Sequence, residues 1–186
     1  MVSSHPVSTR STRRQREREA RERAILTAAR DLFLAKGIPA TTVDDIARAC
    51  DLAKGTIYLY FSSKDEIAFA LLIQTTDELL VDLQDSLDPS LPAVQQLERL
   101  ALAYYRFFIA QPQSFRYMFI VPHEPYSGHV AEALLERWAV AGRAALGIVA
   151  SLLERAAADG DLVVEDAWST AVALWSAVTG VISIPT

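Results

Sequence analysis

The stretch LAKGTIYLYFSSKDEI, residues 52–67, decides how the amino-terminal third of the chain is predicted to fold. Its apolar residues recur at helical spacing and indicate one buried face; they are Leu52, Ile57 and Phe61. The residues left facing outward all carry a hydrogen-bond donor; they are Lys54, Thr56, Tyr58 and Tyr60. Ser63 followed by Glu66 has the spacing of a capping box, so a further helix is predicted to begin there.

Two helices are predicted before this stretch. The first has one apolar face and should end at Gly37; the face is formed by Ile25, Ala28, Ala29, Leu32 and Phe33. The second is short, and Thr42 with Asp45 three residues on is expected to cap it. A tight turn at residues 51–52 and a third helix over about 53–60 complete the layout of a helix-turn-helix.

The composition predicts an all-α protein. Hydrophobic residues make up 51% of the 186 residues, and only seven glycines and eight prolines interrupt a sequence rich in Ala and Leu. The single cysteine, Cys50, cannot form an internal disulfide, and no signal-sequence pattern is present, so a cytoplasmic location is expected. No apolar run reaches the roughly 18 residues that a membrane span requires, so no membrane is expected among the partners.

The net charge of -5 is unevenly distributed along the chain. Residues 1–64 carry 12 Lys and Arg against 7 Asp and Glu, whereas residues 65–186 carry 6 against 16. A basic first part on an acidic remainder suggests that the first part meets a polyanion; the alternative is surface charge that serves solubility.

Residues 1–19 are predicted to form a disordered basic arm. Seven arginines occur between residues 10 and 23, interrupted by three glutamates. Such a run is usually the solvated start of a helix, but as an arm it could reach a minor groove.

The outward residues of the opening stretch suit phosphate binding. Gly55 lacks a side chain at the start of its helix, so backbone amides there can approach phosphate oxygens. Lys64 lies at the start of the next helix, where its charge and the free N–H groups favour the same anion. The alternative is that Tyr58 and Tyr60 are ordinary half-buried aromatics and that the lysines are solvated.

The segment TTVDDIARACDLAKGTIYLYFSSKDEI, residues 41–67, closely resembles the DNA-binding domain of the tetracycline-repressor (TetR) family of bacterial transcriptional regulators. The resemblance implies a helix-turn-helix domain over residues 20–66 whose third helix enters the major groove. The residues that match phosphate-binding positions of the family are Thr42, Tyr58, Tyr60 and Lys64. Those that match positions near bases or the adjoining backbone are Lys54, Gly55, Thr56 and Leu59.

The segment departs from the family pattern at two positions. Asp51 stands where the family usually has glycine, although Asp tolerates a left-handed backbone better than most residues. Ala53 stands where the family often has a capping serine. Leu59 offers only an apolar contact, for example to a thymine methyl group, so modest base readout is expected.

Residues 67–186 are predicted to form a helical ligand-binding and dimerisation domain, with helices from about residues 63–84, 92–110, 112–121, 127–158 and 165–184. Aromatic residues gather on the later helices and suggest a pocket walled by rings, although core packing is the commoner role for any one of them. The candidate ligand contacts are Tyr104, Phe108, Phe115, Met118, Phe119, His123, Trp138 and Trp175.

The resemblance further implies a homodimer joined through the last two helices. Relatives commonly continue with a ninth helix, whereas this sequence ends at Thr186, so either that helix is missing or the dimer uses fewer helices. Small residues over 139–147 would let another helix approach closely, within one protomer or across a two-fold axis.

The hypothesis that joins these observations is a dimeric repressor that binds a palindromic operator in double-stranded DNA and is released by a small hydrophobic or aromatic effector. The alternatives are an all-α enzyme or ligand carrier, and a DNA binder without an effector. The three histidines and one cysteine show no metal-ligand spacing, and no nucleophile elbow, P-loop or dinucleotide fingerprint occurs, so neither a metal nor a cofactor nor catalysis is expected.

Overall fold

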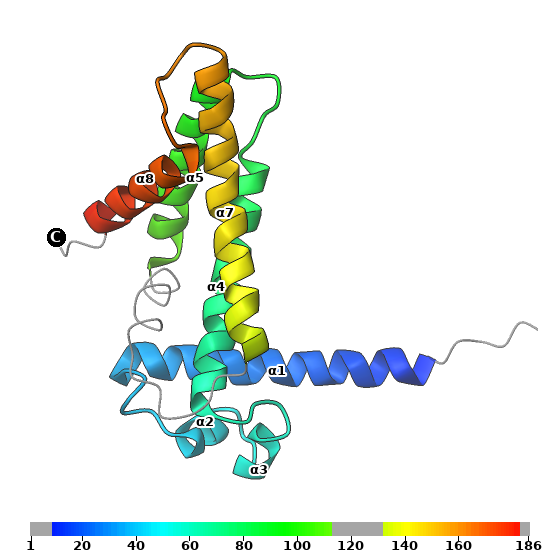
Figure 1. Ribbon diagram of the computed structural model, residues 1–186. Coiled ribbons are helices and arrows are strands. Elements are labelled where there is room, and N and C mark those ends of the chain that lie inside the picture. Colours follow the sequence, from blue (N-terminus) through cyan, green and yellow to red (C-terminus); the bar gives the residue numbers. More distant parts are fainter. Residues whose placement is uncertain (1–8, 113–131, 183–186) are drawn as a thin grey trace, which may run out of the picture. The chain divides into compact units, whose positions relative to one another are not determined.

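The computed structural model describes residues 9–112 and 132–182, and these residues form helices joined by short connections (Figure 1). Its elements are α1 (Thr9–Lys36), α2 (Val43–Ala49), α3 (Lys54–Ile57), α4 (Lys64–Asp85), α5 (Ala93–Ala110), α7 (Glu132–Ala158) and α8 (Ala167–Ile182). No strand occurs within the described ranges, and the predicted all-α class is confirmed. Of the predicted helices, the one over 112–121 lies almost entirely outside the described residues.

The chain divides into two compact units, the first ending at Leu71 and the second beginning at Leu72. Helix α4 contributes residues to both units, because it begins at Lys64 and ends at Asp85. The two units are described separately below.

Helix α1 begins earlier than the sequence suggests. Residues 9–19, expected to belong to a disordered arm, are helical. Arg, Glu and Gln are good helix formers, and two side-chain pairs one turn apart support this part of the helix. Arg13 contacts Glu17 at 2.8 Å, and Gln15 donates to Glu19 at 3.0 Å.

The core of the first unit is formed by one face of α1 and by the two short helices after it. Its buried members include Ile25, Ala29, Phe33, Ile46, Ile57 and Phe61. Gly37 ends α1 with a φ of 85°, in the left-handed region that glycine adopts without strain, and its N–H donates to the Phe33 carbonyl at 2.8 Å.

Asp45 binds three different groups around the start of α2. The Thr42 hydroxyl accepts from the Asp45 N–H at 3.1 Å, and the Asp45 carboxylate accepts from the Thr42 N–H at 3.0 Å, which confirms the predicted reciprocal cap. The same carboxylate accepts from the Lys36 ammonium at 2.6 Å and pairs with Arg48. It therefore joins the end of α1 to both ends of α2.

The turn between α2 and α3 satisfies the end of α2 with two backbone hydrogen bonds. Leu52 donates to the Ala47 carbonyl at 2.9 Å and Asp51 donates to the Arg48 carbonyl at 3.2 Å. This is the Schellman arrangement, which requires a left-handed residue at its first position after the cap. Asp51 supplies it with a φ of 54°, at the position where the resemblance led us to expect glycine.

Helix α3 is shorter than the predicted 53–60. Ala53 precedes it without a side-chain capping bond, and the chain beyond Ile57 continues in turns, with Tyr60 and Phe61 both donating to the Ile57 carbonyl. The predicted cap of α4 is half correct. Ser63 accepts from the Glu66 N–H at 3.0 Å, but the Glu66 carboxylate bonds Ser62 in place of Ser63.

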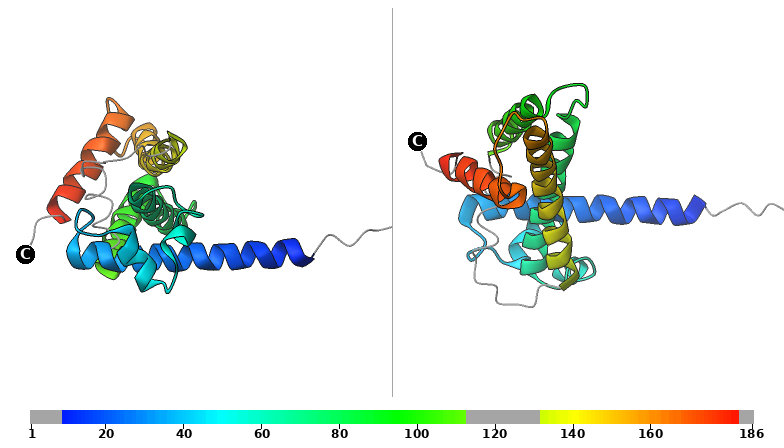
Figure 2. Two further views of the ribbon diagram at one scale, coloured as in Figure 1. Left: turned by 90° about the horizontal axis from the view of Figure 1, so that it is seen from below. Right: turned by 45° about the horizontal axis from the view of Figure 1, so that its top comes forward.

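The second unit packs α5 and α7 against the later part of α4. Its main buried cluster contains Leu79, Leu83, Ala93, Leu100, Tyr104, Phe107, Leu152 and Ala156. A smaller cluster joins α7 to α8 through Ala150, Leu153 and Ala171. Figure 2 shows α8 (red) lying obliquely to α7. The residues from 172 to 178 of α8 are exposed.

Replacing Asp45 by Asn should weaken the protein at neutral pH and flatten its acid response. The hydrogen bond from Lys36, followed by those from the Thr42 N–H and hydroxyl, holds the pKa of Asp45 well below its usual 3.8. A carboxyl group whose pKa is lowered by folding stabilises the native state above its unfolded pKa, and this contribution is lost as the pH falls below about 4.

We therefore expect the urea midpoint of Asp45→Asn to lie below that of the wild type at pH 7 and to approach it as the pH falls toward 2. Asp31→Asn, which removes an exposed carboxylate from α1, serves as the control and should give a nearly constant offset. A constant offset for Asp45→Asn as well would show that its ion pairs do not stabilise the fold.

Candidate nucleic-acid interface

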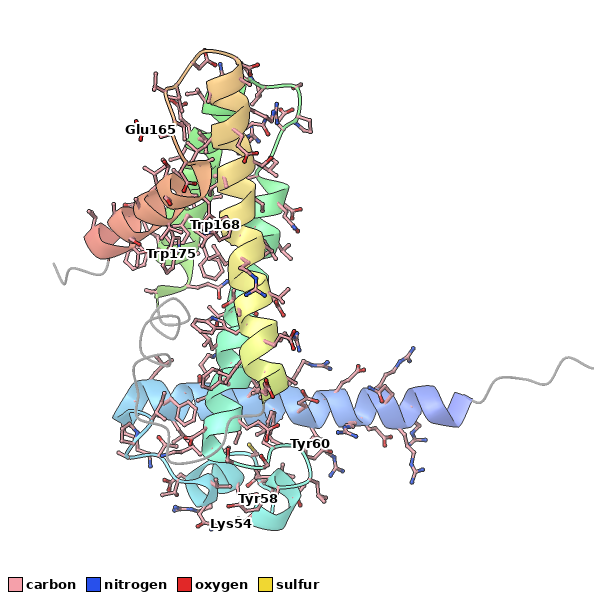
Figure 3. The ribbon with its side chains drawn as sticks, viewed as in Figure 1. Lys54, Tyr58, Tyr60, Glu165, Trp168 and Trp175 are labelled. Carbon is pink, nitrogen blue, oxygen red and sulfur yellow. The ribbon has the colours of Figure 1, made fainter. Side chains whose placement is uncertain are left out.

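The side chains around α3 form an exposed polar surface on the first unit. Figure 3 shows Lys54 and Tyr58 beside α2 and α3, and Tyr60 on the side toward α1. Tyr58 is 48% exposed and Leu59 76% exposed, so neither is a core residue, whereas Tyr60 is half-buried. Leu59 lies in the turns that follow α3, and a leucine exposed to this extent is available for contact with a partner.

Lys54 is held by an acidic residue of α2. Its ammonium lies 2.8 Å from the Asp44 carboxylate, and this hydrogen bond raises the pKa of Lys54, so the lysine stays positively charged. Both side chains are about half exposed, and an exposed ion pair of this kind is weak. A phosphate can therefore compete with Asp44 for the lysine.

Thr42 and Lys64 have structural roles on the same unit. The Thr42 hydroxyl caps α2 and also donates to Asp45 at 2.8 Å, although the residue itself is exposed. The Lys64 ammonium donates to the Ile38 carbonyl at 2.7 Å. An ammonium group has three N–H donors, so this half-buried lysine can hold the chain before α2 and still donate to an acceptor outside.

Gly55 and Thr56 follow Lys54 in α3, and Thr56 is half-buried. Gly55 is exposed, and a Cβ atom placed on it would have no neighbour within 4 Å. The packing of the protein itself therefore does not require a glycine at this position. Its lack of a side chain leaves the backbone at the beginning of α3 open to an approaching partner.

Two residues at this surface were missed by sequence reasoning. Asp44 lies ten positions before Lys54, and the guanidinium of Arg18 lies 5.9 Å from the centre of the Tyr60 ring, 42 positions away in the chain. Neither separation has the three- or four-residue spacing by which helical neighbours are recognised, so only the folded chain reveals these contacts.

The predicted ligand contacts are only partly described. Phe115, Met118, Phe119 and His123 lie outside the described residues. Tyr104 is buried in the main cluster, where burial raises the pKa of its hydroxyl, and that hydroxyl lies 2.8 Å from the Thr179 Oγ. Phe108 packs against the same cluster.

The other two candidates lie on α7 and α8, and one of them reaches Tyr104, because the side chain of Trp175 hydrogen-bonds the Tyr104 hydroxyl. Trp138 is half-buried on α7, and Trp175 is 40% exposed on α8 (Figure 3). A hollow of about 460 Å³ in the second unit is lined by none of the predicted residues; its lining is Leu87, Pro89, Gln96, Ala144, Gly147, Ile148, Ser151, Leu152 and Arg155.

The fold of the first unit defines a protein of the helix-turn-helix class. Residues 25–71 match the profile of the bacterial regulatory proteins of the tetR family, and residues 97–185 match the tetracyclin repressor-like C-terminal domain. The protein belongs to the TetR family of DNA-binding transcriptional regulators, and the resemblance noted from its sequence is confirmed.

Curated relatives match the chain over part of their length. The HTH-type transcriptional repressor KstR2 of Mycobacterium tuberculosis is 31% identical over 86 residues, which are 46% of this chain and 43% of that protein. The uncharacterized HTH-type transcriptional regulator YhgD of Bacillus subtilis is 32% identical over 87 residues, 47% of this chain and 46% of that protein. The chain spans about half the length of the curated relatives it matches.

Solved structures match over most of the chain and show the fold. A regulatory protein in the tetR family from Rhodococcus RHA1 aligns with a TM-score of 0.77 at 22% identity, over 89% of this chain and 85% of that one. The transcriptional regulator FadR from Bacillus subtilis, in complex with stearoyl-CoA, aligns with a TM-score of 0.71 at 17% identity, over 86% and 84% of the two chains.

Within residues 9–112 and 132–182, no helix combines the length and the apolar character needed to cross a bilayer. The same ranges contain no group of three or more His, Cys, Asp or Glu side chains placed to hold a metal ion.

Proposed function

We propose that the protein is a dimeric transcriptional repressor that reads a palindromic operator with α3 and is released from it by a small hydrophobic or aromatic ligand. The observation that carries this proposal is the exposed surface of Lys54, Tyr58 and Leu59, supported from behind by a buried core. A rigid scaffold that presents donors and one apolar side chain suits a partner with phosphates and base edges.

The residues of this surface divide into two proposed roles. Those that would hold phosphates are Thr42, Tyr58, Tyr60 and Lys64. Those that would face bases or the adjoining backbone are Lys54, Gly55, Thr56 and Leu59. Leu59 suits a thymine methyl group, and Lys54 suits the acceptors of guanine once Asp44 has been displaced.

Replacing Lys54 by Gln should weaken binding to duplexes that the wild-type protein selects from a random library. We expect at least a tenfold loss of affinity, and a salt slope smaller by about one unit if the lysine also neutralises a phosphate. Arg143→Gln, which removes the same charge from an exposed position of α7, is the control. Fluorescence anisotropy measures both the affinity and its salt dependence. Equal losses of affinity in the two variants would exclude Lys54 from the interface.

The proposed dimer is supported by the apolar surface of α8. Large hydrophobic residues lie more than a third exposed along this helix; they are Trp168, Val172, Leu174, Trp175, Val178 and Val181. A contiguous apolar surface of this kind usually marks an interface, and a second copy related by a two-fold axis would cover it with the same helix. Each subunit of such a dimer would supply one α3, which suits an operator whose two half-sites lie about 34 Å apart.

Leu174→Glu should therefore dissociate the dimer and lower its affinity for a two-half-site duplex to that for a single half-site. Burying an unpaired carboxylate in the interface is costly, whereas the same change at Leu102, 51% exposed on α5, should leave the dimer intact. Sedimentation velocity measures the two masses. Dissociation by both variants, or by neither, would argue against α8 as the dimer interface.

Release by a hydrophobic ligand is supported by the family and by one structural neighbour. That neighbour, FadR from Bacillus subtilis, was solved in complex with stearoyl-CoA. In this chain the second unit holds aromatic side chains from α5 and α8, and α4 links it covalently to the DNA-binding unit. A tenfold change in operator affinity requires a ligand to discriminate between two states by only about 1.4 kcal/mol.

A panel of acyl-CoA esters, fatty acids and aromatic carboxylates should contain compounds that raise the melting temperature and weaken DNA binding together. A ligand that binds the native state raises the midpoint of thermal unfolding. If the ligand weakens DNA binding, linkage requires DNA to lower the affinity for that ligand by the same factor. If compounds raise the melting temperature but the protein binds no DNA, a ligand carrier is favoured. If no compound changes either the melting temperature or DNA binding, an effector-independent regulator is favoured. The curated relatives of the chain include both a repressor and an activator.

A further inference from the structure

Helix α1 extends well beyond the core that it helps to form. Its buried residues begin at Ile25, whereas its first residue is Thr9. At 1.5 Å per residue, the helix therefore continues for about 24 Å before its first core contact. From residue 13 to residue 21 every side chain is exposed, so core packing does not explain this part of the helix.

The arginines of this extension lie on two different faces. Arg14, Arg18 and Arg21 are spaced by four and three residues, and Ile25 follows Arg21 by four. They therefore continue the buried face of α1 outward from the core. Arg13, Arg16 and Arg23 lie on the remaining faces, and Arg13 is paired with Glu17. Within residues 13–36, the ion pairs of α1 engage Arg13, Arg30 and Lys36, and none is formed by Arg14, Arg18 or Arg21 or by Arg16 or Arg23.

One contact fixes the position of this arginine face relative to the helix-turn-helix. The Arg18 guanidinium lies over the Tyr60 ring, 5.9 Å from its centre, in the geometry of a cation–π interaction. The face formed by Arg14, Arg18 and Arg21 is thus adjacent to Tyr60. This tyrosine is one of the residues proposed above to hold a phosphate. The three residues span about 10 Å of helix, the axial rise of about three base pairs.

We propose that Arg14, Arg18 and Arg21 form a rigid second phosphate-binding edge, which binds the DNA backbone flanking the half-site read by α3. This inference rests on the proposed DNA contacts of α3 and enlarges their footprint. The helical form distinguishes it from a flexible arm: only one face of the extension binds, and the arginines on the other faces remain in solvent.

The chain offers a matched pair of variants that tests this face. The first replaces Arg14, Arg18 and Arg21 by Gln, and the second replaces Arg13, Arg16 and Arg23 by Gln. Both remove three positive charges from the same helix, and Gln retains a good helix propensity. Far-UV circular dichroism should show the helix content of the wild type in both variants, apart from the small effect of the Arg13–Glu17 pair, which only the second variant loses.

Binding is measured on a duplex selected by the wild-type protein, trimmed to the selected site or extended by flanking base pairs of unrelated sequence. We expect the wild type to bind the extended duplex more tightly. Loss of Arg14, Arg18 and Arg21 should abolish that gain and reduce the salt slope by about 2.7 units, at about 0.9 per phosphate. Loss of Arg13, Arg16 and Arg23 should preserve the gain and change the slope by less than about one unit.

Equal effects of the two triple variants would overturn the proposal, because they would show a diffuse attraction of the whole extension. A wild-type protein that binds the trimmed and extended duplexes equally would also overturn it, while leaving the reading by α3 intact. A wild-type protein that selects no duplex at all would refute the proposed function itself.

Discussion

The arrangement of the amino-terminal unit depends on the hydrogen bonds and ion pairs that the Asp45 carboxylate makes. This carboxylate accepts from Lys36 at the end of α1, closes the cap of α2 with Thr42, and pairs with Arg48 one turn later. Helices as short as α2 and α3 are not stable alone in water, so their orientation must come from such links and from the apolar residues beneath them. The exposed side chains of α3 can be positioned only because the backbone that carries them is held in this way.

Local sequence signals predicted this unit well. The cap at Thr42 and the tight turn at residues 51–52 are observed, because each depends on residues within a few positions of one another. At the two positions that depart from the family pattern, Asp51 is left-handed and Ala53 makes no side-chain cap. The extent of α1 was wrong for a physical reason. The arginine-rich segment lacks an apolar face, but helix propensity and side-chain pairs one turn apart keep it helical.

The candidate sites were harder to predict than the fold. The residues of α3 could be named from helical spacing, but their partners Asp44 and Arg18 come from other helices and carry no periodic signal. The aromatic residues of the second unit shared one compositional signal and still have different environments. Tyr104 is buried in the core with its hydroxyl bonded to Thr179 and Trp175, whereas Trp175 itself is 40% exposed on α8. Composition reports how much ring surface a unit holds and does not report where each ring faces.

The continuity of α1 also governs how its exposed part unwinds. Starting a helix in isolation is unfavourable, whereas adding a residue to an existing turn is nearly neutral in free energy. The buried turns around Ile25 and Ala29 act as a nucleus, so the arginine-bearing turns need no nucleation of their own and fray only from the amino-terminal end of the helix. Cooling should lengthen the ordered part and warming should shorten it, which makes the length of this helix a property of temperature as well as of sequence.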